Sequence, residues 1–293
     1  MIHTIQNRHL AVQVDDLGAQ LCSVRSSDGT EYIWQADPAI WGRHAPLLFP
    51  VIGRLQDGQY TLDGQVFSIP IHGFARDSLF QVVNSSDSTL TFLLTDSPES
   101  RAVYPFSFSL AVTCALEENR LTKSFRVENH SPRNMYYELG GHEGYRAPLT
   151  SDQTMDDYAV LVPGLDVLTP YGMDPGSYMV TPKGASYPLD RGRIPLRPSA
   201  FHLDTIILDQ LPARRAMLAD RAGRPRVTVD FPDFPSLGLW TQGSPRNTNF
   251  VCIEPWSTLP DAVFAGRSLA DKPGIRTLAP SSSEVLSYTI TFQ

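Results

Sequence analysis

The 293-residue chain carries 24 Lys and Arg residues against 31 Asp and Glu residues, which gives it a net charge of −7. This acidic balance, without a long basic run, argues against nucleic acid as a partner, because phosphate backbones are held by clustered Lys and Arg. Apolar residues make up 42% of the chain and charged residues 19%, so a sizeable core is expected and global disorder is excluded. A single domain over residues 1–293 is predicted, since all-β sandwiches often reach this length.

Neither a membrane span nor a secretory leader is predicted. A stretch of roughly 18 consecutive apolar residues, which a spanning helix needs, occurs nowhere, and the first residues contain no apolar run. Cys22, Cys114 and Cys252 form no C-x-x-C pair and cannot all be bridged within the chain, which suits a reducing compartment. We therefore expect a cytoplasmic protein whose cysteines are small buried hydrophobic residues.

Short runs of alternating apolar and polar residues recur along the chain and predict half-buried β strands. In chain order they cover residues 9–14, 60–62, 90–94, 106–111, 121–127, 227–231 and 285–292. Hairpins are predicted at Asp63-Gly64 and at Glu118-Asn119, which are turn-forming pairs between such runs. No amphipathic helix of three turns competes with these strands.

Proline and glycine cluster over residues 162–198, which predicts loop or edge structure. Strand patterns continue on both sides, so we interpret this stretch as an excursion within one domain. Many antiparallel strands without crossover helices indicate sheets packed face to face. We predict an all-β supersandwich of antiparallel sheets, whose broad concave face can gather polar side chains around one small ligand.

Several reaction classes lose support because their motifs are missing. The sequence contains no G-x-x-x-x-G-K-[ST], no strand-linked G-x-G-x-x-G, no G-x-S-x-G and no H-E-x-x-H. Phosphate cradles, dinucleotide sites and serine-hydrolase elbows are therefore not expected.

Glu254 is the most informative polar residue. It follows an apolar run, and strand alternation places it on one face with Phe250 and Cys252, at the end of a mostly buried strand. A carboxylate buried there without a cation has a raised pKa and can act as a general base near neutral pH. The alternative is a structural ion pair with Arg246 or Arg267.

Two histidines lie beside glycine residues, His72 in IHGFAR and His142 in GGHEGY. Glycine lets backbone or ligand approach closely, and imidazole titrates near neutral pH, so both are candidates for proton transfer. A structural role is the alternative for either one. His72, His142 and Glu254 could also hold zinc, but they lack His-x-His spacing and a second clustered ligand, so no metal is predicted.

Other residues are candidates for holding a ligand. Arg54 follows the apolar run FPVIG and could bind several hydroxyl groups through its guanidinium, or form a surface ion pair with Asp57. Asp204, where a strand is expected to begin, could accept hydrogen bonds from neighbouring hydroxyl groups or cap a turn. Tryptophan rings could face a sugar, although core packing is the simpler expectation for each of Trp34, Trp41, Trp240 and Trp256.

Together these segments resemble the aldose 1-epimerase (galactose mutarotase) family, in particular its short bacterial branch. The similarity extends over nearly the whole chain. It is carried by APLLFPVIGRLQDGQYTLDGQVFSIPIHGFAR, YELGGHEGYRAPL, HLDTIILDQL, NFVCIEPWSTLPDA and KPGIRTLAPSSSEVLSYTITF. The resemblance implies a galactose mutarotase-like β-supersandwich with an open sugar cleft, and an isomerase that needs no cofactor.

The resemblance also implies roles for individual residues. Glu254 matches the general base of the family, and His142 matches its general acid. His72 matches a histidine that assists at the ring oxygen or binds the substrate. Arg54 and Asp204 match a binding arginine and a binding aspartate.

The sequence departs from the family pattern at two places. Glu143-Gly144 follows His142, where a proline and a small residue are expected, and Ser257-Thr258 follows EPW, where glycine is commoner. Both departures flank the proposed acid and base without replacing them. They therefore bear on sugar preference more than on the reaction.

The predicted reaction is exchange between the α and β anomers of a free aldose. Glu254 takes the proton of the C1 hydroxyl while His142 gives one to the ring oxygen, and we expect the two to face each other across a pyranose-sized gap. A non-catalytic carbohydrate-binding protein is one alternative. Another is a mutarotase of hexose 6-phosphates, with the phosphate held by Arg76 or Arg43. A monosaccharide is the expected partner, and the sequence leaves monomer and homodimer open.

Overall fold

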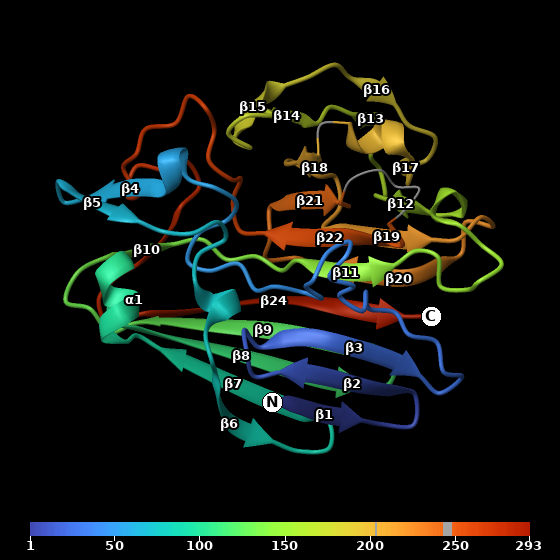
Figure 1. Ribbon diagram of the computed structural model, residues 1–293, viewed down its shortest axis with the longest axis horizontal. Helices are drawn as coiled ribbons and strands as arrows, with labels where there is room; N and C mark the ends of the chain where they lie inside the picture. Colours follow the sequence, from blue (N-terminus) through green and yellow to red (C-terminus); the bar gives the residue numbers. More distant parts are fainter. Residues whose placement is uncertain (203, 243–247) are drawn as a thin grey trace.

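Antiparallel β strands dominate the chain (Figure 1), as the alternating sequence pattern predicts. The computed structural model describes residues 1–202, 204–242 and 248–293. In this part of the chain the longest helix is α1 (Pro98–Val103), and the four 3-10 segments are shorter. The 3-10 segments are η1 (Gln56–Gly58), η2 (Ala75–Asp77), η3 (Met155–Asp157) and η4 (Pro198–Phe201).

The largest sheet in the described residues has nine strands. In spatial order they are β17 (Arg193–Pro195), β12 (Ala159–Leu161), β19 (Arg215–Ala219), β20 (Pro225–Asp230), β24 (Ser283–Phe292), β9 (Arg120–Asn129), β8 (Phe108–Glu117), β7 (Thr89–Thr95) and β6 (Gln81–Ser85). The turn at Glu118-Asn119 joins β8 to β9 as predicted, with Glu117 paired to Arg120.

A six-stranded sheet carries most of the site described below. Its spatial order is β11 (Glu143–Arg146), β22 (Phe250–Trp256), β21 (Ser236–Trp240), β18 (Thr205–Leu208), β14 (Tyr171–Met173) and β15 (Val180–Lys183). A three-stranded sheet in the described residues consists of β1 (Ile2–Gln6), β2 (Leu10–Asp15) and β3 (Gln20–Ser26). The two-stranded sheets consist of β4 (Gln59–Leu62) with β5 (Gln65–Ser68), β10 (Met135–Tyr137) with β23 (Arg276–Leu278), and β13 (Val167–Leu168) with β16 (Tyr187–Pro188). The predicted Asp63-Gly64 turn joins β4 to β5.

The main hydrophobic core lies between the layers and draws on residues from Ile5 to Phe292. Residues of β8 alternate in burial, so that Leu110, Val112 and Cys114 point inward, as a strand with one buried face requires. The three-stranded sheet closes over this layer, and the ring of His3 on β1 lies 5.7 Å from that of Phe92 on β7. These packed antiparallel layers confirm the predicted all-β supersandwich.

The proline- and glycine-rich residues 162–198 form short strands at sheet edges, as predicted. Strands β14 and β15 extend one edge of the six-stranded sheet, and β17 lies at one edge of the nine-stranded sheet. Edge positions tolerate proline because one side of the strand needs no ladder hydrogen bonds. This excursion supplies Met173 and Tyr178 to the site.

All three cysteines are buried and free, as expected for small core residues. The prediction that Glu254 ends its strand is wrong, because β22 continues through Pro255 to Trp256. β22 lies between two strands of the same sheet, and every one of its residues is buried. Glu254 therefore lies inside a buried central strand and not at the end of a strand, as the sequence pattern predicted.

Candidate functional site

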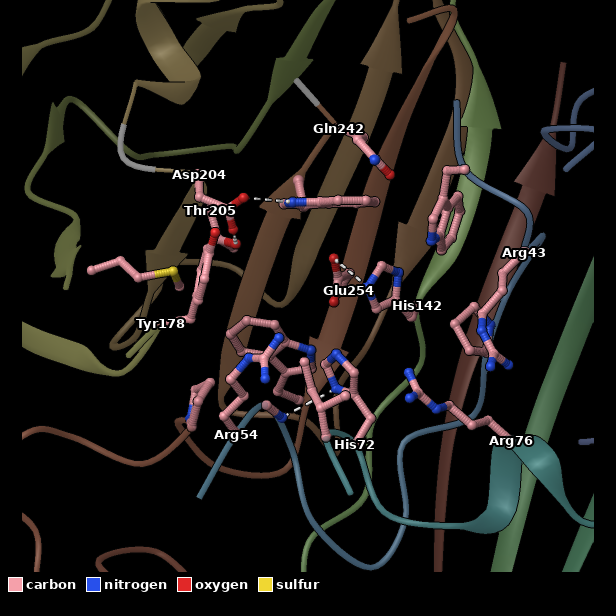
Figure 2. A pocket seen from close by; sticks show the side chains of 18 residues that line it. Arg43, Arg54, His72, Arg76, His142, Tyr178, Asp204, Thr205, Gln242 and Glu254 are labelled. Atoms are coloured by element: carbon pink, nitrogen blue, oxygen red, sulfur yellow. Dashed lines mark hydrogen bonds and ion pairs between the residues drawn. The ribbon is translucent and has the colours of Figure 1, made fainter. Parts of the chain in front are cut away.

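The six residues singled out from the sequence all line one cavity of about 300 Å³ (Figure 2). This volume is at the lower end of the range of about 300–1,000 Å³ that is usual for small-molecule sites. The six are Arg54, His72, Arg76, His142, Asp204 and Glu254. Figure 2 shows Glu254 and His142 at the centre, with Asp204 and Tyr178 on one side and Arg43 and Arg76 on the other.

His142 and Glu254 meet because of strand register. The antiparallel pairs Glu143–Ile253 and Gly140–Trp256 place His142 directly opposite Glu254. Nε2 of His142 lies 3.4 Å from Oε1 of Glu254. The predicted pyranose-sized gap between them is therefore wrong, because the two side chains lie side by side in the cavity wall.

Burial controls the protonation of this pair. Glu254 is 1% exposed and His142 is 8% exposed. Burial raises the pKa of Glu254 well above its usual range, and the charges of Asp204 and Glu143 raise it further. Burial lowers the pKa of His142 to about 3. Both shifts favour the uncharged forms, a protonated carboxyl group and a neutral imidazole. The pair therefore carries one titratable proton over a wide pH range.

Glu254 does not form the ion pair with Arg267 that was the structural alternative. Arg267 instead pairs with Asp57 and donates to Gln59. The other candidate partner, Arg246, lies outside the described residues.

His72 is held in a left-handed backbone conformation, with φ of 63°. The next residue, Gly73, has φ of 71°, and a Cβ there would lie 2.2 Å from the carbonyl oxygen of Phe49, so only glycine fits. The backbone N–H of Gly53 donates to Nδ1 of His72 at 3.1 Å. Since Nδ1 accepts, the proton of the neutral ring is on Nε2, and burial keeps the ring neutral by lowering its pKa.

Arg54 is exposed at the cavity mouth and stacks on a residue that the sequence did not single out. Its Cζ lies 5.3 Å from the ring centroid of Tyr178, within cation–π range. The ion pair with Asp57 that the sequence left open does not form, because Asp57 binds Arg267. Nothing local marked Tyr178, which reaches the cavity only because β14 and β15 extend the six-stranded sheet.

Asp204 directly precedes β18, as predicted, and has φ of 73°. Its carboxylate accepts hydrogen bonds from the Trp240 indole at 3.2 Å and from the Thr205 hydroxyl at 2.9 Å. These two donors orient the carboxylate beside the cavity, which its lone pairs can still reach.

Arg76 and Arg43 bring excess positive charge to the opposite side. Arg43 forms an ion pair with Asp77 at 2.8 Å, and Nε of Arg76 lies 3.4 Å from the other oxygen of the same carboxylate. Burial lowers the pKa of Arg76, and the charge of Arg43 adds to this effect. Two guanidinium groups thus share one carboxylate, which leaves net positive charge at the cavity wall.

Three of the four tryptophans line the cavity, namely Trp41, Trp240 and Trp256. Trp41 stacks on His142 with ring centroids 5.2 Å apart, whereas Trp34 packs on Phe250 as a core residue.

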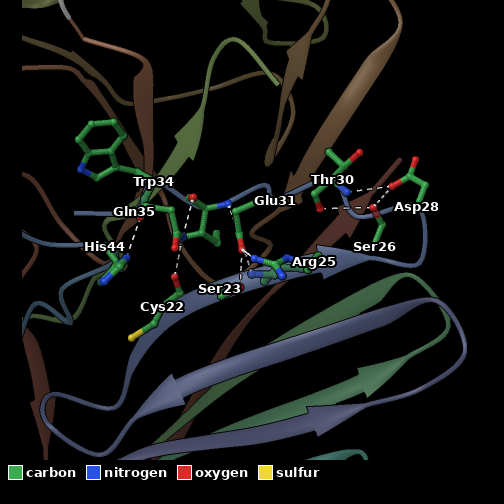
Figure 3. A network of polar contacts seen from close by, with 12 residues as sticks. Cys22, Ser23, Arg25, Ser26, Asp28, Thr30, Glu31, Trp34, Gln35 and His44 are labelled. Carbon is green, nitrogen blue, oxygen red and sulfur yellow. Dashed lines mark hydrogen bonds and ion pairs between the residues drawn. The ribbon is translucent and has the colours of Figure 1, made fainter. Parts of the chain in front are cut away.

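Polar contacts hold the segment before Trp41 in place (Figure 3). The carboxylate of the buried Glu31 accepts hydrogen bonds from the backbone N–H groups of Val24 and Ile33. Nδ1 of His44 contacts the Trp34 carbonyl oxygen at 2.7 Å, which closes the loop that presents Trp41.

A buried ion pair lies behind β11, the strand that begins directly after His142. Nζ of Lys123 lies 2.6 Å from Oε1 of Glu143, and the Tyr288 hydroxyl donates to the same oxygen at 2.5 Å. Glu143, one of the departures from the family pattern, therefore points into the core and away from the cavity. Gly141, which directly precedes His142, has no room for a side chain, because a Cβ would lie 2.3 Å from the Tyr288 hydroxyl oxygen.

A set of potential metal ligands at the site differs from the one considered from sequence. His142, Cys252 and Glu254 each offer one ligand atom, and these atoms lie within 4.8 Å of one another. His72 is not part of this group. Burial raises the pKa values of the Cys252 thiol and the Glu254 carboxyl, which disfavours the deprotonated forms that bind metal. That the site needs no metal stays a prediction.

Comparison with known proteins identifies the family. The aldose 1-epimerase family model matches residues 1–276. The chain belongs to the aldose 1-epimerase family. Protein LacX (chromosomal) of Lactococcus lactis subsp. lactis is 31% identical over 294 residues, covering 98% of each chain.

Solved structures of this family share the whole fold. A galactose mutarotase related enzyme from Lactobacillus acidophilus superimposes with a TM-score of 0.93 at 33% identity, covering 100% of this chain and 97% of the other. A galactose mutarotase-like protein from Lactobacillus casei gives a TM-score of 0.89 at 30% identity, with 100% of both chains covered. Among the described residues, no helix has the length and hydrophobicity required to traverse a lipid bilayer.

Proposed function

We propose that this aldose 1-epimerase family member is a mutarotase that exchanges the α and β anomers of a free aldose by acid–base ring opening. The observation that carries the proposal is the 3.4 Å approach of His142 Nε2 and Glu254 Oε1 on the floor of a sugar-sized cavity. One group must accept a proton while its neighbour donates one, and this pair can do both.

The reaction proceeds through the open-chain aldehyde. Glu254 takes the proton of the C1 hydroxyl, the bond between C1 and the ring oxygen breaks, and the ring oxygen receives a proton from His142. Rotation about the C1–C2 bond then exposes the other face of the carbonyl. Ring closure with the two roles exchanged returns both groups to their starting states, so the cycle consumes no cofactor.

The proton count of the pair fits this cycle. A pair with one proton can place it on Glu254 or on His142, and these two states differ only by a transfer across the 3.4 Å contact. Burial favours the uncharged state, in which the proton is on Glu254. Either state supplies one donor and one acceptor, which is what a reversible exchange requires.

The remaining residues would hold and orient the ring. Nε2–H of His72 is free to donate toward the substrate because Nδ1 is occupied by Gly53. Asp204 and Arg54 can accept from and donate to sugar hydroxyl groups, and the Trp41 and Trp240 rings offer apolar faces. The cavity therefore combines polar groups at its ends with flat aromatic walls, an arrangement that suits a pyranose.

The decisive experiment is an NMR measurement of anomer exchange across a panel of aldoses, including glucose and galactose. We expect exchange to be faster with the protein than in buffer alone for at least one free sugar. A protein that binds sugars without accelerating exchange would instead be a carbohydrate-binding protein, the non-catalytic alternative.

A second candidate substrate class is a hexose 6-phosphate, which Arg43 and Arg76 favour. If His142 serves the ring oxygen and Glu254 the C1 hydroxyl, then C5 and C6 of the sugar lie on the His142 side. Figure 2 places Arg43 and Arg76 on that side, where they share one carboxylate and could hold a phosphate. Glucose 6-phosphate in the same panel separates the two classes.

A further inference from the structure

A buried cluster of three charged residues lies just outside the cavity. Nζ of Lys272 lies 2.6 Å from Oε1 of Glu138 and 2.7 Å from Oδ1 of Asp261. Glu138 is 0% exposed, Asp261 5% and Lys272 8%. Two carboxyl groups thus share one ammonium in the interior, where burial of charge costs free energy and raises the pKa of Glu138.

The cluster is connected directly to the backbone that carries the site. The second oxygen of Glu138, Oε2, accepts from the backbone N–H of Ile52 at 2.7 Å. The backbone N–H of Glu138 donates to the Pro50 carbonyl oxygen at 2.8 Å. Glu138 is thus hydrogen-bonded to both Pro50 and Ile52, the two ends of the turn that precedes Gly53.

That turn determines which nitrogen of His72 carries the proton. Gly53 is the next residue after Ile52, and its N–H donates to Nδ1 of His72 while its carbonyl oxygen accepts from the His72 N–H at 2.9 Å. These two bonds also hold His72 in its left-handed conformation. Arg54 follows immediately and enters the cavity wall.

Asp261, the third member of the cluster, is hydrogen-bonded to the strand next to Tyr178, on another side of the cavity. Asp261 accepts at its carbonyl oxygen from the Val180 N–H at 2.8 Å, which joins it to the edge strand next to Tyr178. Pro260 packs against Gly53, because a Cβ atom added at Gly53 would lie 2.8 Å from the Cβ atom of Pro260. Lys272 therefore connects the turn under His72 to the segment that carries Pro260.

We propose that Glu138 and Lys272 are positioning residues, which fix the Nε2–H tautomer of His72 and the placement of Arg54 by holding the Ile52–Gly53 backbone. The proposal rests on the proposed mutarotase function for its kinetic consequence. The tautomer of His72 is a property of the free protein, so it can be tested separately.

The first test compares Glu138→Gln with Glu138→Leu. The amide oxygen of glutamine can still accept from Ile52, whereas leucine cannot. We expect Glu138→Leu to lower kcat/KM for mutarotation at least about tenfold, and Glu138→Gln to retain at least about a third of the wild-type value, because small displacements of catalytic groups are costly. Lys272→Met should act in the same direction as Glu138→Leu.

The second readout is the imidazole ¹⁵N spectrum of the full-length protein, with the His72 signals assigned by their loss in His72→Gln. We expect the Nε2–H tautomer in the wild type and in Glu138→Gln, and a mixture of tautomers in Glu138→Leu. This measurement stands even if the protein proves to have no mutarotase activity.

Asn129→Ala is the matched control for lost stability. Asn129 is fully buried and donates to the carbonyl oxygens of Arg133, Leu278 and Ala279, without lining the cavity. We expect it to lower Tm while leaving the His72 spectrum and kcat/KM near wild type. Two results would overturn the proposal: an unchanged His72 tautomer in Glu138→Leu, or a loss of kcat/KM in that variant no larger than in Asn129→Ala at equal Tm.

Discussion

His142, which directly precedes β11, lies opposite Glu254 of the neighbouring strand β22, with Nε2 of the imidazole 3.4 Å from Oε1 of the carboxyl. The spacing follows from backbone register, because directly opposed residues of an antiparallel pair point to the same face of the sheet. The imidazole and the carboxyl are thereby held beside each other by backbone pairing. The hydroxyl and ring oxygens at an anomeric centre are bonded to the same carbon, so an acid and a base this close can serve both.

The acid–base pair is the first point to test by mutation. We expect Glu254→Gln and His142→Ala each to lower mutarotation of a freshly dissolved aldose at least about tenfold, since a positioned acid or base contributes roughly 10²–10⁴-fold. Polarimetry gives the rate directly. Glu128→Gln, which changes a carboxylate of β9 outside the cavity, should behave as wild type. Wild-type rates in both site variants would refute the assignment.

The pH dependence should follow from the single proton on this pair. Burial lowers the pKa of His142 to about 3 and raises that of Glu254 well above its usual range. Below about pH 3 both groups are protonated and no base remains, and above the raised pKa of Glu254 both have lost their protons and no acid remains. We therefore expect the enzymatic rate to be level through pH 5–7, a range that includes the ordinary imidazole pKa of about 6.5.

The measurement is the initial rate against pH, after subtraction of the rate in buffer, with circular dichroism to verify folding at each pH. An acidic limb near pH 6.5, the ordinary pKa of imidazole, would contradict this account of the pair.

Asp204 should contribute to substrate binding more than to the chemical step. Its carboxylate is oriented by Trp240 and Thr205 and lies to one side of the acid–base pair. We expect Asp204→Ala to raise KM about tenfold, in line with the ~1.5–3 kcal/mol of a hydrogen bond to a charged group, and to change kcat less. Saturation kinetics separate the two parameters. A loss confined to kcat would instead give Asp204 a part in the reaction itself.

The arginine pair distinguishes free from phosphorylated sugars. If the substrate carries a 6-phosphate, Arg76→Met should lower the ratio of kcat/KM for glucose 6-phosphate to that for glucose at least about tenfold, because a charge-assisted contact is lost. Arg43→Met should change the ratio in the same direction. A ratio unaffected by both substitutions would leave the free aldose as the substrate class.

The buried pair behind the site should affect stability strongly. Glu143→Ala would leave the Lys123 ammonium buried without its partner, and we expect it to lower the free energy of unfolding by about 3–5 kcal/mol in urea titrations. Replacing both residues, as Lys123→Met with Glu143→Leu, should cost less, since neither charge then needs compensation. A double variant less stable than Glu143→Ala would show that the ion pair itself is strongly stabilising.

Local sequence patterns determined the strands and several of the site residues of this protein. Alternation over β8, β9 and β24 requires only that one face of each strand be buried, and the Asp63-Gly64 and Glu118-Asn119 turns depend on neighbouring residues alone. Glu254 could be identified from the sequence as a carboxylate that follows an apolar run. His72 and His142 could be identified because each lies beside glycine. The resemblance to the family added the expected roles of these residues.

Only the tertiary structure decided how the site is arranged. Strand register, which depends on pairing between distant segments, put His142 against Glu254 where the sequence predicted a gap between them. Burial, which depends on all surrounding layers, lowered one pKa and raised the other. Tyr178 and the Glu138–Lys272 pair carry no local signal, because their places near the cavity come from a sheet edge and a buried charge cluster formed by segments far apart in the chain.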